Sequence, residues 1–238
     1  MSARVAAVRQ NLKKLANKEK AKFLLGFFKT GPGQYGEGDK LYGIAVPETR
    51  KVAKQFPDLS FEEIDELLQS EWHEERLIAL IILVTQFKKA KREEDRKKIY
   101  QFYIAHTDRI NNWDLVDTSA RDIFGGYLFE KDEKPFYKLA KSKLLWDRRI
   151  AMIGTFYSIC KGRSELALAI AELLLNDKED LMHKAVGWML REVGKRASEV
   201  ALRRFLDEHA ATMPRTALRY AIEKFSPRER AIYLAKKQ

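Results

Sequence analysis

Apolar residues recur at three- and four-residue spacing along almost the whole chain of 238 residues. This is the spacing expected for one buried face of an α-helix, which repeats about every 3.6 residues. Segments with this spacing include VAAVRQNLKKLA, FEEIDELLQS, RRIAMIGTFYSI and SELALAIAELLL, whereas no convincing run alternates with the period of two that marks a strand. The pattern therefore predicts an all-α protein.

Capping signals mark several helix starts. Ser60 is followed three residues later by Glu63, and Ser226 by Glu229, which is the spacing of a capping box. The apolar run Leu77–Val84 would suit a buried strand if it stood alone. Its charged flanks, HEER and TQFKKAKREE, favour a buried helix instead.

A basic residue followed three positions later by a small or apolar residue recurs near the start of apolar helices. Arg76, Arg148 and Lys184 fit this pattern, and Asn112 falls at the remaining position of a 36-residue period (76, 112, 148, 184). Helix pairs of this length bury their apolar faces by stacking on their neighbours. We therefore expect a HEAT-like helical-repeat solenoid, an α-α superhelix, that forms a single domain over residues 1–238.

Four residues stand out when each repeat is counted from its Asn or basic position. Trp113, Asp117, Arg149 and Trp188 occupy offsets one, four and five, where other repeats place mostly aliphatic residues. These offsets cover an arc of about 100° on a helix, so they predict side chains on one wall of the solenoid. The alternative is that both tryptophans belong to the core and that Asp117 and Arg149 form a buried ion pair.

The net charge indicates the kind of partner. The chain has 45 Lys and Arg residues against 34 Asp and Glu residues, a formal charge of +11. Such a surface attracts polyanions, most commonly nucleic acid and less commonly an anionic membrane. We expect the solenoid to present a concave basic surface that suits nucleic acid.

Two absences in the sequence suit a cytoplasmic protein that does not associate with membranes. The longest uncharged run, Leu77–Phe87, is far shorter than the ~20 residues that cross a bilayer, and no basic and apolar export signal begins the chain. Cys160 is the single cysteine, and its apolar neighbours predict a buried small hydrophobe in a reducing compartment.

The common catalytic patterns are not visible in the sequence. The four histidines lack a metal-ligand spacing, and there is no serine elbow or Cys–His pair, so we expect neither a metal nor a cofactor. The glycine-rich segment Thr30–Gly43 lacks the Gly-Lys-Ser/Thr ending of a nucleotide loop. It is either a plain connection between helices or a loop whose N–H groups approach a phosphate.

The set of two indoles and one carboxylate suits a substrate or transition state that carries positive charge, because aromatic faces and carboxylates both stabilise cations. At these residues the sequence resembles the AlkD family of bacterial DNA alkylation repair glycosylases. The resemblance runs along nearly the whole chain, through the segments FFKTGPGQYGEGDKLYGI, NNWDLVDTSA, LWDRRIAMI, HKAVGWMLREVGKR and MPRTALRYAIEKF.

The resemblance assigns roles to individual residues. It implies that Asp117 is the catalytic carboxylate and that Trp113 and Trp188 face the substrate. It also implies that Arg149 contacts the DNA backbone, with its neighbour Arg148 as the alternative. Lys184, the basic position of the following repeat, completes the expected DNA-binding set, while Asn112 departs from the family in replacing an aromatic residue.

The implied reaction is hydrolysis of the N-glycosidic bond of cationic alkylated purines, such as 7-methylguanine and 3-methyladenine, without base flipping. The implied partner is double-stranded DNA that contains alkylated bases, bound by a monomer with no obligate protein partner. Two other functions stay open at this point. One is a non-catalytic protein that binds DNA structure, and the other is a HEAT-repeat scaffold that binds proteins.

Overall fold

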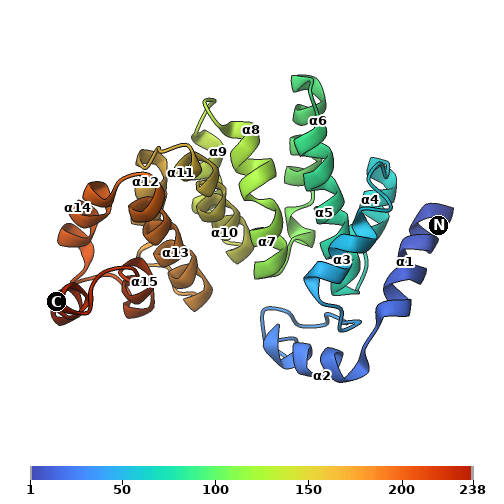
Figure 1. Ribbon diagram of the computed structural model, residues 1–238, viewed down its shortest axis with the longest axis horizontal. Coiled ribbons are helices and arrows are strands. Elements are labelled where there is room, and N and C mark those ends of the chain that lie inside the picture. The colour runs from blue at the N-terminus through green and yellow to red at the C-terminus, as the bar shows by residue number, and fades with distance from the viewer. Residues whose placement is uncertain (1, 237–238) are drawn as a thin grey trace. The chain divides into compact units, whose positions relative to one another are not determined.

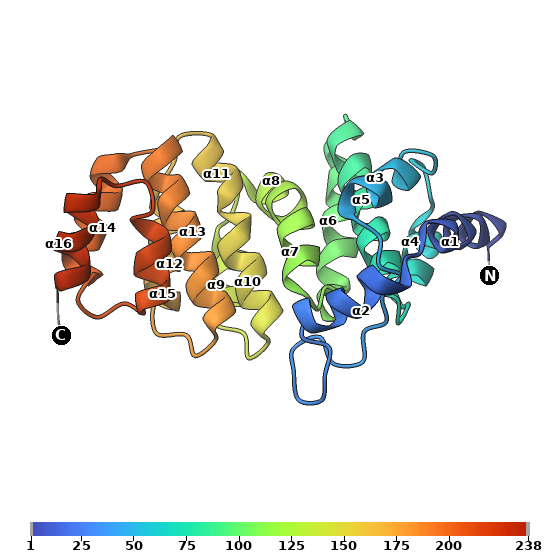
Figure 2. The same cartoon turned by 60° about the horizontal axis from the view of Figure 1, so that its bottom comes forward.

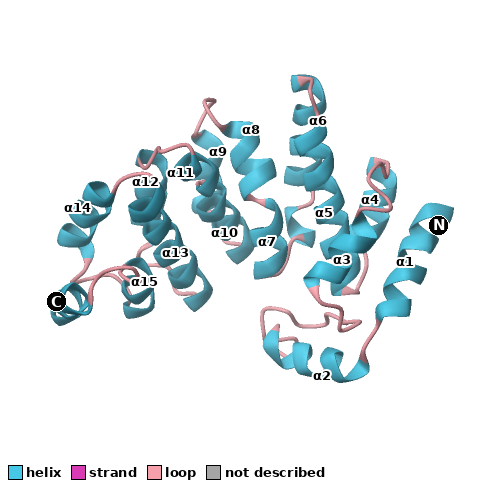
Figure 3. Ribbon diagram, in the orientation of Figure 1, coloured by secondary structure: helices cyan, strands magenta, loops and turns pink. Residues whose placement is uncertain are grey.

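The computed structural model of the chain describes residues 2–236, and within this range all regular structure is helical (Figure 3). The single exception to helix and loop is an isolated bridge between Lys40 and Trp72. The predicted all-α class is thus confirmed. Within the described part of the chain, no helix has both the length and the apolar character needed to span a membrane.

The contacts divide the chain into two compact units, Met1–Ser119 and Ala120–Gln238. The prediction of one domain over residues 1–238 concerns independent folding and stays a prediction. The first unit contains eight helical elements in its described range: α1 Ala3–Leu15, α2 Lys18–Phe27, α3 Val46–Ala53, α4 Phe61–Leu68, α5 His73–Lys89, α6 Glu93–Ala105, the 3₁₀ turn η1 Thr107–Arg109 and α7 Trp113–Ser119 (Figure 1).

The second unit begins with a π-helix, a rare form with hydrogen bonds five residues apart. In this unit the bond runs from the N–H of Gly125 to the carbonyl of Ala120, at 2.9 Å. The elements of the unit are η2 Arg121–Gly125, α8 Gly126–Leu128, α9 Lys134–Ala140, α10 Leu145–Gly154, α11 Phe156–Cys160, α12 Glu165–Leu174, α13 Asp180–Arg196, α14 Glu199–His209, α15 Arg215–Ala221 and α16 Pro227–Ala235 (Figure 2).

The core of the first unit is built around α5. The whole run Leu77–Val84 is helical and buried, as its flanks predict. Helices α3, α4 and α7 all pack against α5. The helix is apolar on every side because neighbours cover it on several sides.

The core of the second unit is built around α13, against which α10, α12, α14 and α15 pack. Glycines permit the closest crossings. A Cβ atom on Gly187 would lie 2.4 Å from the carbonyl oxygen of Ala217, and one on Gly125 would lie 2.0 Å from that of Gly154. Because each neighbour is backbone, these positions exclude any larger residue.

The predicted capping boxes are present at both sites. The Ser60 hydroxyl accepts the N–H of Glu63, whose carboxylate accepts the N–H of Ser60, and Ser226 and Glu229 repeat the arrangement. Cys160 contradicts its prediction, because it is exposed. The five-residue helix α11 ends at this residue, and the side chain follows the turn out to solvent.

The same hydrogen bond recurs in successive repeats, from a side chain near the start of a helix to the carbonyl six residues earlier. This recurrence confirms the helical-repeat organisation and corrects the position assigned to the repeat that contains Lys184. Nη1 of Arg76 donates to the carbonyl of Ser70 at 2.8 Å, and Nη1 of Arg148 donates to that of Ser142 at 3.1 Å, six residues earlier in both cases. In the next repeat the equivalent donor is His183, whose Nε2 lies 2.6 Å from the carbonyl of Asp177. Lys184 is therefore not the equivalent position, since this repeat is one residue shorter than the 36-residue register requires.

Candidate functional site

Helix α7 places Trp113 and Asp117 one turn apart on one face, as the sequence predicts. The helix begins at Trp113 because Asn112 caps it. The fully buried Asn112 side chain accepts the N–H of Trp113 at 2.8 Å, and its carbonyl accepts that of Val116 at 3.2 Å. Leu115 and Val116 point into the core, so Trp113 and Asp117 lie on the half-buried side.

Trp113 belongs to an aromatic cluster within the first unit. Its indole stacks on Phe28, with ring centroids 5.5 Å apart and planes inclined by 26°. Phe27, at the end of α2, meets the indole edge-on at 5.7 Å and is itself 52% exposed. Trp113 therefore contacts the buried ring of Phe28 and also the exposed ring of Phe27. This environment is neither that of a core tryptophan nor that of a free surface residue.

A buried charged network lies beneath this cluster. The imidazole of His73 lies 4.6 Å from the Phe28 ring. Its Nε2 is 2.8 Å from Oδ2 of Asp114, and its Nδ1 is 3.2 Å from Oδ2 of Asp39. Arg76 donates to the other oxygen of Asp39 at 2.6 Å. With His73 protonated, two cations and two carboxylates balance one another, which makes their burial tolerable.

The network shifts the pKa values of its members. Burial alone lowers the pKa of His73, but the charge of Asp114 and hydrogen bonds to Asp114 and Asp39 outweigh it and raise the pKa to about 9. Burial raises the pKa of Asp39, but the hydrogen bond from His73 and the charge of Arg76 bring it below its usual range. His73 is therefore an imidazolium at neutral pH.

The glycine-rich loop completes the network. It supplies Asp39, and Gly36 packs so closely that a Cβ there would lie 2.5 Å from the carbonyl of Phe28. The backbone N–H groups of Gly31, Gly33 and Gly36 already donate to oxygens within the loop or its flanks. This favours the connecting role over the alternative in which these N–H groups meet a phosphate.

In the second unit Trp188 is half-buried on α13, and Phe156 meets it edge-on at 5.9 Å. Two guanidinium groups lie over the Phe156 ring, that of Arg121 at 5.7 Å and that of Arg196 at 5.5 Å. Arg121 also donates to both carboxylate oxygens of its neighbour Asp122, at 3.0 and 3.1 Å. Cations thus gather around the aromatic pair that contains Trp188.

The sequence-predicted phosphate contacts are already engaged in this structure. Arg149 is only 4% exposed, and its Nη1 donates to the carbonyl of Leu181 at 2.7 Å, which joins α10 to α13. Arg148 is paired with Asp177 through Nε at 2.5 Å. Lys184 pairs with Asp180 at 2.8 Å within α13. The structure thus groups Trp113 with Asp117 in one unit, and Arg148, Arg149, Lys184 and Trp188 in the other.

Sequence reasoning missed Phe28, His73 and Asp39 as partners of Trp113. His73 carries no metal-ligand spacing, and among residues 2–236 no group of three or more His, Cys, Asp or Glu could hold a metal ion. The available signal was the charged pattern around Trp72–Arg76 at the head of an otherwise apolar helix. A buried charged residue at that position needs a partner of opposite charge.

The comparisons with known proteins agree with the resemblance to AlkD-like proteins. Among solved structures, the chain is similar to a predicted DNA alkylation repair enzyme from Enterococcus faecalis, with 18% identity, coverage of 89% of this chain and 97% of that one, and a TM-score of 0.69. It is also similar to AlkD2 from Streptococcus mutans, with 19% identity, coverage of 94% and 97%, and a TM-score of 0.53. At these identities the likeness is one of fold.

No curated protein matches the chain. The model of the family described as DNA alkylation repair enzymes matches residues 8–225. Because this match covers most of the 238 residues, the chain belongs to the DNA alkylation repair enzyme family.

Proposed function

We propose that the protein is a DNA glycosylase that hydrolyses the N-glycosidic bond of cationic alkylated purines, such as 7-methylguanine and 3-methyladenine, in duplex DNA. The observation that carries the proposal is the pairing of Trp113 and Asp117 one turn apart on α7, with Trp113 stacked on Phe28. Family membership supports a role in DNA alkylation repair.

The chemistry suits such a pair because the substrate is already activated. Alkylation leaves positive charge on the purine, so the base departs with the bonding electrons as a neutral leaving group. Positive charge then develops on the deoxyribose, and water adds to C1′ and loses a proton. We assign to Asp117 the stabilisation of this oxocarbenium-like charge and the orientation of the water, a contribution typically worth ~3 to 4 kcal/mol.

The aromatic residues supply the second part of the proposal. Trp113 and Trp188 present π faces to the cationic sugar and base, a contact that reaches about 2 kcal/mol when water is excluded. Most glycosylases extrude the target base into a pocket. Here we propose that the bond is hydrolysed without flipping, so that the electrostatics of Asp117 and the two indoles replace recognition of an extruded base.

Contact with the DNA backbone forms the third part. The proposal names Arg149, with Arg148 as the alternative and Lys184 as a further contact. The burial of Arg149 and the ion pair between Arg148 and Asp177 mean that either guanidinium must exchange its present partner for a phosphate. Lys184 is easier to recruit, because its side chain is 43% exposed and its pair with Asp180 is weak in solvent.

We further propose that the protein acts in the cytoplasm as a monomer, without a cofactor or an obligate protein partner. The concave basic surface expected from the charge of +11 belongs to the same proposal. Such a surface predicts an affinity for DNA that falls steeply with salt.

The decisive experiment measures release of 7-methylguanine from methylated duplex DNA by the wild type and by Asp117→Asn. We expect release by the wild type and a loss of about two to three orders of magnitude in the variant. Asp95→Asn is the matched control, since it removes a carboxylate that only pairs with the exposed Arg92. Equal release by wild type and Asp117→Asn would overturn the mechanism, and salt-sensitive DNA binding without release would identify a non-catalytic DNA-structure binder.

A further inference from the structure

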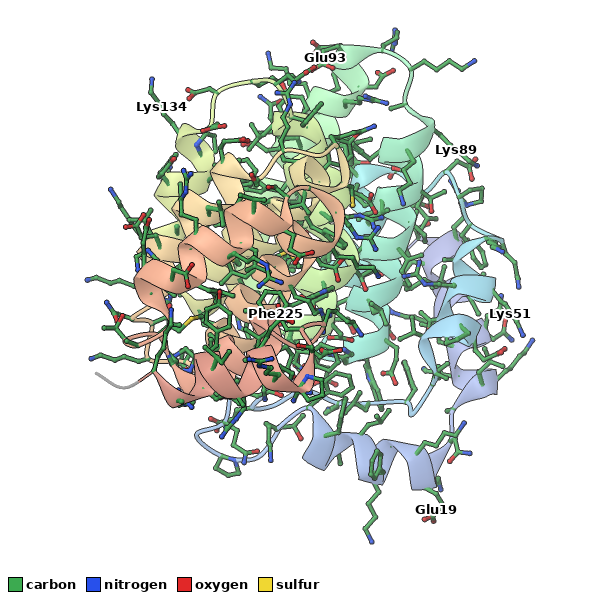
Figure 4. The ribbon with its side chains drawn as sticks, turned by 60° about the vertical axis from the view of Figure 1, so that its left-hand side comes forward. Glu19, Lys51, Lys89, Glu93, Lys134 and Phe225 are labelled. Atoms are coloured by element: carbon green, nitrogen blue, oxygen red, sulfur yellow. The ribbon has the colours of Figure 1, made fainter. Side chains whose placement is uncertain are left out.

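A cationic cavity lies between α3 and α5 in the first unit. Its volume is about 200 Å³, and Ile81 forms part of its apolar floor. Its rim carries Arg50 and Lys54, from the end of α3, and Lys89, from the end of α5. Figure 4 shows Lys89 reaching outward from the ribbon. The cavity has room for roughly six water molecules at ~30 Å³ each, enough for an anion that keeps part of its hydration.

The three cations of this cavity are not neutralised. None of its lining residues is acidic, and none of the three forms an ion pair with any carboxylate of residues 2–236. The acidic residues nearest to Arg50 and Lys54 along the chain pair with other cations, Glu48 with Lys51 at 2.8 Å and Asp58 with Arg4 at 3.0 Å.

Helix dipoles account for only part of this arrangement. A cation in the last turn of a helix gains about 0.3 to 1 kcal/mol from the dipole. Arg50 and Lys51 on α3 and Lys88 and Lys89 on α5 stand in those turns, whereas Lys54 follows the end of α3. The dipoles do not explain why Arg50, Lys54 and Lys89 line one cavity, where they repel one another and where a bound anion would remove that repulsion.

The repeat register relates the cavity to Asp117. Ile81 on the cavity floor stands 36 residues before Asp117 (117 − 36 = 81), at the equivalent position of the preceding repeat. Helices α5 and α7 pack against each other. Packed helices lie ~8 to 10 Å apart, and successive nucleotides of one strand rise ~3.4 Å along the duplex axis, so for repeats that follow this axis one repeat corresponds to two or three nucleotides.

We propose that Arg50, Lys54 and Lys89 bind a backbone phosphate of DNA, two or three nucleotides from the deoxyribose that Asp117 contacts. The position of that deoxyribose rests on the proposed function, whereas the phosphate site itself does not. The hydroxyl of Thr85 also lines the cavity, but it donates its hydrogen to the carbonyl of Ile81. The phosphate is therefore bound by the three cations and not by this hydroxyl.

The first test compares two variants that lose the same charge. One is Arg50→Gln/Lys54→Gln/Lys89→Gln, and the control is Lys40→Gln/Lys51→Gln/Arg92→Gln, whose cations pair with Glu71, Glu48 and Asp95 in the same unit. Losing one phosphate contact reduces the slope of log K against log salt concentration by about 0.9. We expect that reduction in the cavity variant and a clearly smaller one in the control, with duplex DNA as the probe. Equal salt slopes in the cavity variant and the control variant would overturn the proposal.

The second test locates the phosphate. Methylphosphonate linkages remove single backbone charges from a duplex that carries one tetrahydrofuran abasic analogue. Neutralising the linkage two or three nucleotides from the analogue should weaken binding by the wild type and leave binding by the cavity variant unchanged. Sensitivity of both proteins at that linkage would contradict the assignment.

A third arm separates a DNA phosphate from a free anion. Titration with inorganic phosphate alone, followed by NMR of the lysine side chains, measures the free-anion affinity of the cavity. Phosphate binding that is lost in the cavity variant, together with an unchanged DNA salt slope, would overturn the DNA assignment. Base release by the wild type is scored separately, so that failure of the glycosylase proposal and failure of the phosphate site give different results.

Discussion

Nε2 of His73 lies 2.8 Å from Oδ2 of Asp114, the residue that follows Trp113. This contact ties the start of α7 to the start of α5, and Phe28 lies against both His73 and Trp113. The orientation of Trp113 thus depends on a buried ion pair and on a stacked ring, neither of which is exposed to solvent.

The His73 network predicts that stability decreases at alkaline pH. The pKa of His73 is about 9 in the folded protein against an ordinary value of 6.5, so protonation favours folding. Its contribution is fully present below about pH 6.5 and is lost as the pH rises through 9. At ~1.4 kcal/mol per pKa unit, the change is roughly 3 kcal/mol.

Urea unfolding of the wild type and His73→Gln at pH 6, 7.5 and 9.5 measures this effect. The difference in unfolding free energy between the two proteins should shrink with rising pH, since the other titrating groups are common to both. A difference that stays constant across this range would show that His73 does not titrate with folding.

Phe28→Leu should lower the rate of base release while the fold is kept. Leucine fills much of the space of this 7% exposed ring, but the stack with Trp113 is lost. An aromatic pair is worth about 0.5 to 1.5 kcal/mol beyond its buried area, which corresponds to a rate loss of roughly two- to thirteenfold. The measurement is the single-turnover rate of 7-methylguanine release.

Phe87→Leu is the control for this prediction, because Phe87 is similarly buried, at 5%, on the same unit's α5 and stacks on no tryptophan among the described residues. It should keep the wild-type rate. Equal losses in the two variants would mean that general loosening of the unit, and not the stack on Trp113, sets the rate.

The sequence predicted those features that depend on local chemistry. The capping boxes at Ser60 and Ser226 and the buried helix around Leu77–Val84 follow from neighbouring residues, and all are confirmed. The placement of Trp113 and Asp117 on one helix face also follows from spacing alone.

The features that the sequence did not predict depend on a loop or on a change of register. Asp39 reaches His73 only because the loop folds back over α5, and no periodic pattern encodes that path. The repeat that contains His183 is one residue short, so a fixed 36-residue period selected Lys184 instead. Cys160 is exposed because a five-residue helix ends there, which its apolar neighbours do not reveal.

Gly125→Ala should destabilise the second unit strongly. Its new Cβ would lie 2.0 Å from the carbonyl oxygen of Gly154, and relief requires two backbone segments to separate. Overpacking of this kind typically costs about 1 to 3 kcal/mol or more. Gly26→Ala is the contrasting variant, because Gly26 is inside α2 and its new Cβ would have no atom within 4 Å apart from the adjoining backbone of the helix itself. Helix propensity predicts that it gains about 0.5 to 1 kcal/mol. Thermal unfolding should show a lower melting temperature for Gly125→Ala and a higher one for Gly26→Ala than for the wild type.

Glu74→Gln should loosen the connection between the glycine-rich loop and α5. The carboxylate of Glu74 is 1% exposed and accepts the backbone N–H groups of Tyr42, Gly43 and Ile44 at 2.8 to 3.1 Å. Both carboxylate oxygens of Glu74 act as acceptors, and glutamine replaces one of them with an NH₂ group, which cannot accept. At least one buried backbone N–H therefore loses its partner, which lowers the free energy of unfolding by about 1 to 3 kcal/mol. Glu71→Gln, which affects only an exposed pair with Lys40, should change stability by less than about 1 kcal/mol.

Hydrogen exchange should show faster exchange at residues 42–44 in Glu74→Gln alone. Because the same loop supplies Asp39 to His73, base release should fall in this variant too, whereas unchanged exchange would show that the three bonds do not hold the loop.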